Sequence, residues 1–156
     1  YNLLGDPALR IAGNTEGQPT DDTFAKWRWE RFAPDELADD SVSGADADPD
    51  GDGQSTFLEY ALGSLPLDGT GSIPSLMTGK GASADSKVRL TWRRKKGASD
   101  VDYQILASDD LIGWELYGSE LEILTVTSES DGMEEVEAEV PFLKDQLYIK
   151  LDIIQK

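Results

Sequence analysis

The stretch DPDGDGQSTFLE, residues 48–59, alternates carboxylates with small residues and ends in a glutamate within an apolar run. An EF-hand-like calcium loop takes oxygen ligands from positions 1, 3, 5, 7, 9 and 12 and needs glycine at position 6 for its sharp turn. Counted from Asp48, each of these positions holds a suitable residue, and Gly53 stands at position 6. The predicted Ca²⁺ ligands are the side chains of Asp48, Asp50, Asp52, Thr56 and Glu59 and the backbone carbonyl of Gln54.

Two other interpretations of this stretch stay open. A loop counted from Asp46 would place Phe57 at position 12, without the bidentate glutamate, so the count from Asp48 is preferred and Asp46 adds charge nearby. The stretch could also be a solvated acidic turn, with Phe57 and Tyr60 serving only as core residues. The segment ADDSVSGADA before the loop does not have the pattern of a regular helix, so we expect a permanent structural ion rather than a sensor.

Composition limits the kinds of chemistry available. The chain has 156 residues, with 31 Asp and Glu against 14 Lys and Arg, and a formal net charge of −17. This balance argues against nucleic acid and anionic membranes as partners and suits metal cations. With no Cys and no His, soft-ligand metal sites and Cys–His or Ser–His–Asp catalytic centres are excluded within this chain. We therefore expect a protein that is not an enzyme, with no membrane-spanning helix.

The first half of the chain predicts short helices around the acidic loop. In TFAKWRWERF, spacing at 100° per residue gathers Phe24, Ala25, Trp29 and Phe32 on one face, with Trp27 at its margin. A second turn is predicted to begin at Pro34 and run through Leu37, and a further helix to cover residues 55–62. Gly63 is its expected C-terminal cap.

From residue 87 onward, apolar residues alternate with polar ones, which is typical of β-strands. The predicted strands are residues 87–94, 101–108, 121–128, 134–141 and 147–154. The fold class expected is mainly β with a small α part: an antiparallel β-sandwich, or a small barrel-like sheet, preceded by a helix–calcium loop–helix unit. The predicted parts are an N-terminal apolar strand and linker at 1–20, the helical calcium-loop unit at 21–66, a linker or long loop at 67–86, and the β-sandwich at 87–156.

Residues 24–156 resemble a known module. The run DADPDGDGQSTFLEYALGSLP is similar to the Asp-rich calcium module near the C-terminus of large secreted proteins of Verrucomicrobia and Planctomycetes, and SDDLIGWE and TWRRKKG resemble signatures of the β-sandwich that follows it. Thr56 departs from the Asn that is more frequent there. The resemblance implies an extracellular or cell-surface location and a structural or adhesive role.

The opening YNLLGDPALRI resembles the end of the catalytic domain of gingipain-type cysteine peptidases. This second resemblance implies that the chain is the C-terminal accessory fragment of a secreted peptidase, with the catalytic Cys and His upstream. The start at Tyr1, without Met, leads us to expect a piece of a longer protein.

Several functions remain open at this point. The first is an extracellular, calcium-binding structural module, in which the apolar strand within residues 1–13 pairs with its own sheet or joins a neighbouring subunit into an oligomer or fibre. A peptidase fragment is the second. A carbohydrate-binding module is the third, and it would need exposed coplanar aromatics; Trp29 and Trp92 fit core positions, while Trp27 and Trp114 are undecided. The basic run at 93–96 is either a solvated hairpin end or an anion contact.

Overall fold

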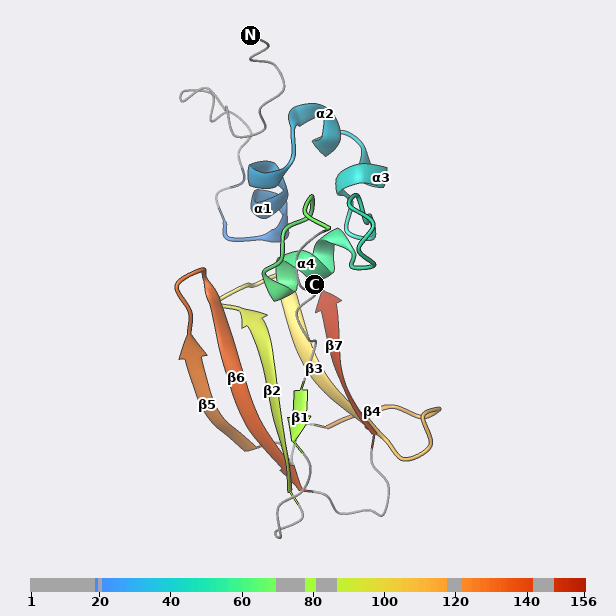
Figure 1. The fold of residues 1–156 in the computed structure, drawn as a ribbon, viewed down its shortest axis with the longest axis vertical. Helices are drawn as coiled ribbons and strands as arrows, with labels where there is room; N and C mark the ends of the chain where they lie inside the picture. The colour runs from blue at the N-terminus through green and yellow to red at the C-terminus, as the bar shows by residue number, and fades with distance from the viewer. Residues whose placement is uncertain (1–18, 20, 70–77, 81–86, 118–121, 142–147) are drawn as a thin grey trace. The chain divides into compact units, whose positions relative to one another are not determined.

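The computed structural model describes residues 19, 21–69, 78–80, 87–117, 122–141 and 148–156 (Figure 1). These residues form two compact units. The first contains the described residues up to Tyr60, residues 64–69 and the turn Gly97–Asp100. The second contains Ala61–Gly63 and the remaining described residues, which include all the strands.

Short helices and an aromatic core make up the first unit. Its helices are α1 (Phe24–Arg31), α2 (Pro34–Leu37), α3 (Asp40–Ser43) and α4 (Thr56–Leu62), of which α4 continues into the second unit. Five aromatic rings pack together with centroid separations of 5.4 to 6.5 Å, and all five side chains are buried. They belong to Phe24, Trp27, Phe32, Phe57 and Tyr60. One ring pair is stacked and the others are tilted or edge-on. These contacts hold the helices together, since none of the four helices is long enough to be stable alone.

The apolar face predicted for α1 is wrong in part. Ala25 is exposed and Trp29 is only half-buried, whereas Trp27, predicted at the margin, is 6% exposed. The helix ends at Arg31, and Phe32 follows in an extended conformation with φ −109° and ψ 149°. Phe32 therefore reaches the core from outside the helix, and including it in the helical wheel rotated the predicted face. The turn beginning at Pro34 is confirmed as α2, and α3 was not predicted.

The second unit is antiparallel throughout. Its strands are β1 (Thr78–Lys80), β2 (Lys87–Lys95), β3 (Val101–Ser108), β4 (Glu115–Leu116), β5 (Glu122–Ser128), β6 (Met133–Pro141) and β7 (Tyr148–Gln155). They form one sheet in the order β1-β2-β6-β5 and another in the order β4-β3-β7. The five predicted strands are confirmed as β2, β3, β5, β6 and β7, and the chain is mainly β with a small α part.

Apolar and polar residues alternate along the strands, so the apolar side chains lie on one side and pack into a single cluster. Leu90 lies opposite Ala138 and Trp92 opposite Val136 in the β2–β6 pairing, and all four are buried. Ile105 of β3 and Leu151 of β7 join the same cluster, so both sheets contribute to it. The prediction that Trp92 serves as a core residue is confirmed.

The polar face of β2 is paired with acidic side chains. Lys87 and Arg89 both contact Glu139 of β6 at 3.1 Å. In the basic run at 93–96, Arg93 contacts Glu129 at 2.6 Å and Arg94 contacts Glu134 at 2.6 Å. These ion pairs across the sheet favour the solvated hairpin end over an anion contact.

Parts of the predictions fall outside the described residues. The N-terminal strand at 1–13, which also carries the peptidase resemblance, lies outside them, as does most of the predicted linker at 67–86. Within that linker the structure places β1, which pairs with β2. Among the described residues, no helix combines the length and the apolar character that a membrane crossing requires.

Candidate metal centre

Hydrogen bonds between the Asp48 side chain and backbone N–H groups of the same loop hold the acidic loop in its turn. The carboxylate of Asp48 accepts the N–H groups of Gly51 at 2.9 Å and Gly53 at 3.0 Å, one on each oxygen. Gly53 has φ +93°, a left-handed conformation in which any side chain would be strained. The glycine predicted at position 6 thus occupies a point where the chain reverses around Asp48.

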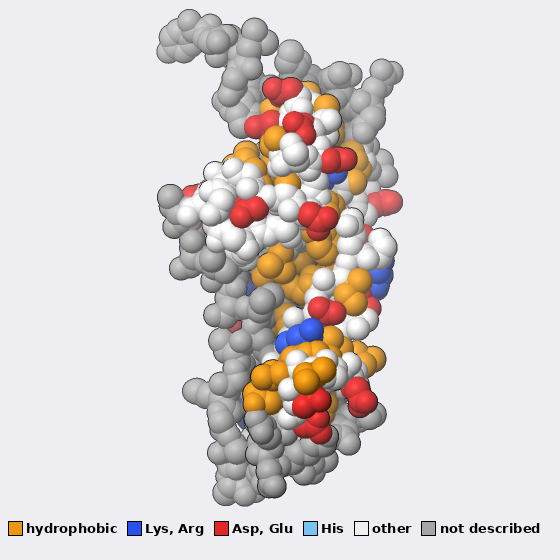
Figure 2. Space-filling view, turned by 90° about the vertical axis from the view of Figure 1, so that its right-hand side faces the viewer, with side chains coloured by type: hydrophobic (Ala, Val, Ile, Leu, Met, Phe, Trp, Pro, Cys, Tyr) orange, Lys and Arg blue, Asp and Glu red, His pale blue; other side chains and the backbone are white. Residues whose placement is uncertain are grey.

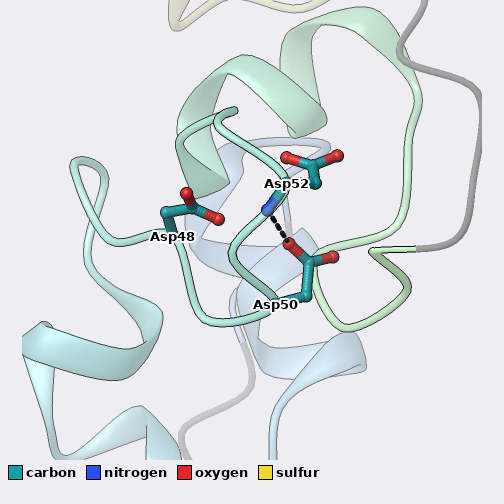
Figure 3. A group of neighbouring side chains, drawn as sticks. All are labelled: Asp48, Asp50 and Asp52. Carbon is teal, nitrogen blue, oxygen red and sulfur yellow. Dashed lines mark hydrogen bonds between the residues drawn. The ribbon is translucent and has the colours of Figure 1, made fainter.

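Three carboxylates converge inside this turn. One carboxylate oxygen from each of Asp48, Asp50 and Asp52 can be chosen so that all lie within 4.8 Å of one another. Figure 3 shows the three side chains carried by a single turn, with the Asp52 N–H donating to Asp50 Oδ1 at 3.3 Å. Two like charges at about 4 Å repel by roughly 1 kcal/mol in water and roughly 4 kcal/mol near a protein surface. Such a cluster is costly unless a cation compensates it.

Glu59 is the most informative residue of the site. Its side chain is 0% exposed, and neither of its carboxylate oxygens has a hydrogen-bond partner. Burial, together with the charges of Asp50, Asp52 and Asp48, raises the pKa of Glu59 to about 7. A buried, unpaired carboxylate is unfavourable when it is ionised, and either a bound proton or a bound cation relieves that cost.

Helix α4 fixes Glu59 relative to the loop. Its first residue, Thr56, donates from both its backbone N–H and its hydroxyl to the Ala47 carbonyl, at 2.7 and 2.9 Å. At the other end Gly63 has φ +82°, and the Ser64 N–H donates to the Glu59 carbonyl at 2.9 Å. This is the Schellman arrangement, so the predicted C-terminal cap at Gly63 is confirmed. The helix is thereby closed at both ends around the glutamate.

The two remaining predicted ligands, Gln54 and Thr56, are both buried. Thr56 is fully buried, and its hydroxyl hydrogen is used by Ala47, which leaves oxygen lone pairs. Gln54 is buried, its backbone N–H donates to Asp52 Oδ1 at 2.7 Å, and its side-chain oxygen has no hydrogen-bond partner. Only the backbone carbonyl of Gln54 was considered from the sequence, so this side-chain oxygen was missed. Asp50 Oδ2 is likewise buried without a partner.

The chemistry of this set is that of a hard-cation site. Every unpartnered group is an oxygen, and most of the groups carry negative charge, which is the ligand type that Ca²⁺ prefers. Sites of this kind need six to eight oxygens. The structure groups one oxygen from each of Asp48, Asp50 and Asp52, and Glu59 does not belong to that group.

The segment SDDLIGWE, residues 108–115, which resembles a sandwich signature, forms a turn held by its own side chains. Ser108 Oγ accepts the Leu111 N–H at 2.9 Å, and Asp110 Oδ1 accepts those of Ile112 and Gly113 at 2.8 and 2.9 Å. Leu111 has φ +65°, and Ile112 is 86% exposed. This connection lies on the side of Figure 1 that faces the viewer in Figure 2, where hydrophobic side chains are exposed in the lower half. The serine and aspartate of the signature therefore build a turn.

The tryptophans do not form an open platform. All four are described: Trp27 and Trp92 are buried, and Trp29 and Trp114 are half-buried. The Lys150 ammonium lies 4.5 Å from the ring centroid of Trp114 and covers it. The coplanar exposed aromatics that a carbohydrate-binding module would need are not found among these side chains.

Neither a comparison with protein-family models nor a search of curated proteins finds a match to this chain.

Proposed function

We propose that this chain is an extracellular, calcium-stabilised structural or adhesive module without catalytic activity. One observation carries the proposal: Glu59 is completely buried with both carboxylate oxygens unpaired, next to three converging aspartates. A divalent cation would neutralise this charge and use the oxygens that no hydrogen bond uses. A solvated acidic turn explains exposed aspartates, but it does not explain a buried glutamate whose pKa those aspartates raise.

The proposed ligands are those predicted by the count from Asp48. Asp48, Asp50 and Asp52 bind through their carboxylates and Glu59 binds with both oxygens. The carbonyl of Gln54 completes the set, and Thr56 contributes its hydroxyl or holds a water ligand. In this proposal α3 and α4 are the two helices of a helix–calcium loop–helix unit, with α3 reduced to four residues.

The proposal includes a β-sandwich for the second unit. Its support is the single apolar cluster to which both antiparallel sheets contribute. Sandwiches of this kind serve widely as structural and adhesive domains, although the fold alone does not determine function.

The extracellular location follows from the resemblance and agrees with the chemistry. Calcium sites that act as permanent structural elements are readily filled outside the cell, where affinities of about 10⁻⁴–10⁻³ M suffice. A large acidic excess, visible as scattered red side chains in Figure 2, also favours a freely soluble surface.

Calorimetric titration of chelator-treated protein with CaCl₂ tests the proposal. We expect one ion per chain, and much weaker binding of Mg²⁺, which dehydrates reluctantly and demands octahedral geometry. Glu59→Gln should weaken calcium binding by at least about tenfold, since it removes the residue expected to bind with two oxygens. Asp46→Asn is the matched control, because it removes one exposed charge beside the loop but no proposed ligand. The site would be refuted if calcium titration of the wild type gave no binding heat, or if Glu59→Gln and Asp46→Asn bound calcium with equal affinity.

A further inference from the structure

Asp100 lies far from the acidic loop in sequence but is bonded to the helix that carries Glu59. It ends the turn Gly97–Asp100, which belongs to the first unit together with Phe24 and Tyr60. Its Oδ1 accepts the Tyr60 hydroxyl at 2.9 Å, and its Oδ2 accepts the Phe24 N–H at 2.6 Å. Both oxygens of one carboxylate thus hold two different helices.

At Phe24 the contact replaces a missing cap. Thr23, at the N-cap position of α1, makes no side-chain hydrogen bond to the helix. Asp100 supplies that acceptor instead, and a negative charge at a helix N-terminus is favourable. The start of α1 is therefore fixed by a residue 76 positions along the chain.

At Tyr60 the contact reaches the metal centre. Tyr60 follows Glu59 directly in α4 and is 1% exposed, with its ring 5.5 Å from Phe24 and 5.7 Å from Trp27. The ring is confined by these neighbours, and its hydroxyl is confined by Asp100. Because both residues are in one helix, a rotation of α4 that moved Glu59 away from the loop would also break the bond to Asp100.

We propose that Asp100 is a positioning residue for the calcium site, acting through Tyr60 to hold α4 in the orientation that presents Glu59 to the ion. This inference rests on the proposed function. A stronger hydrogen bond between Tyr60 and Asp100 raises the population of molecules in which α4 presents Glu59 to the ion. When that population falls, the apparent dissociation constant for calcium rises. The coupling is reciprocal: calcium binding stabilises the bonds that Asp100 makes.

Tyr60→Phe is the sharpest test, because it deletes one hydroxyl and changes no charge. We expect its calcium dissociation constant to rise about tenfold, a typical effect for residues that orient metal ligands. Asp100→Asn should act in the same direction. Tyr117→Phe is the matched control: it deletes a tyrosine hydroxyl that donates to the Pro141 carbonyl at 3.1 Å within the second unit, and its calcium affinity should be unchanged.

Two readouts separate positioning from a merely structural role. Tyr60→Phe should lower the melting temperature more with calcium than without it, whereas a purely structural bond would lower both equally. In the wild type, calcium should slow amide hydrogen exchange at Phe24 but not at Gly113, whose N–H is held by Asp110. The second readout needs no variant, so it remains decisive if a substituted chain fails to fold.

These experiments distinguish a failure of the Asp100 proposal from a failure of the proposed calcium site. If the wild type binds no calcium, both proposals fall. If it binds calcium but Tyr60→Phe has the wild-type affinity, or if Phe24 exchange does not respond to the ion, the calcium site stands and the role of Asp100 is refuted.

Discussion

At the scale of single residues, the most unusual feature is Glu59, a buried carboxylate without a hydrogen-bond partner. Most buried carboxylates in proteins are paired or hydrogen-bonded, and Glu59 is neither. Its position, eleven residues after Asp48, is set by the loop count, but its burial could not be derived from the sequence. That burial, with both oxygens unpaired, is the observation on which we base the proposed cation.

Glu59 predicts a distinctive pH dependence for the metal-free protein. Its pKa is raised from 4.5 to about 7 in the folded chain, so between these values the folded state holds a proton that the unfolded state has released. Metal-free stability should therefore fall as pH rises from about 4.5 to about 7, by roughly 3 kcal/mol from this group. Urea unfolding of chelator-treated protein at pH 5 and pH 8 measures the change.

The comparison with Glu59→Gln isolates this effect from other titrating groups. The variant cannot ionise at this position, so its stability should change less than that of the wild type across the same interval. At lower pH the sign reverses, because the N–H groups of Gly113 and Ile112 lower the pKa of Asp110, and stability is lost as that carboxylate becomes protonated. Identical pH profiles for wild type and Glu59→Gln would contradict the burial of a charged glutamate.

At the scale of elements, the long strands could be predicted and the short elements could not. The alternation in β2, β3, β6 and β7 reflects strands with one apolar side, and it gave their limits to within a residue or two. β1 and β4, of three and two residues, are too short to show a period. α3 is likewise only four residues long. The face of α1 was misjudged because Phe32 lies beyond the helix end.

The candidate metal centre could also be predicted only in part, because some of its contacts are local in sequence and others are distant. The oxygens of the loop and Glu59 lie within twelve consecutive residues, so counting positions was enough to group them. Asp100 could not be predicted, since its contacts with Phe24 and Tyr60 depend on how the turn Gly97–Asp100 meets two helices. In the sequence it appears only as the end of a turn.

Strand β5 offers an edge for assembly. It lies at the end of the four-stranded sheet and pairs only with β6 among the described residues. Ile123 and Val126 lie opposite the buried Ala138 and Val136, yet they are 47% and 45% exposed. Edge strands with exposed apolar side chains and little charge can accept a further strand.

We therefore expect any self-association to proceed by addition of a strand from the N-terminal segment at 1–13 of a neighbouring chain. Sedimentation or light scattering of the full chain and of a chain lacking residues 1–13 tests this. The full chain should form oligomers and the truncated chain should remain monomeric. Monomers in both cases would exclude strand addition as the mode of assembly.

At the scale of the whole molecule, we propose that a calcium ion is part of the folded structure. The acidic excess of the chain, −17 overall, repels itself in the folded state, and three of its carboxylates lie together in the loop. An ion that binds only the folded form stabilises it by about 2.7 kcal/mol when present at 100 times its dissociation constant.

The most direct test is thermal unfolding of the wild type with saturating calcium and after removal of calcium by a chelator. The melting temperature should be at least about 5 °C higher with calcium, and returning calcium to the chelated protein should restore it. Glu59→Gln should show a smaller difference, while Asp46→Asn should retain the wild-type one. A wild-type melting temperature that is the same with and without calcium would contradict the claim that the ion holds this fold.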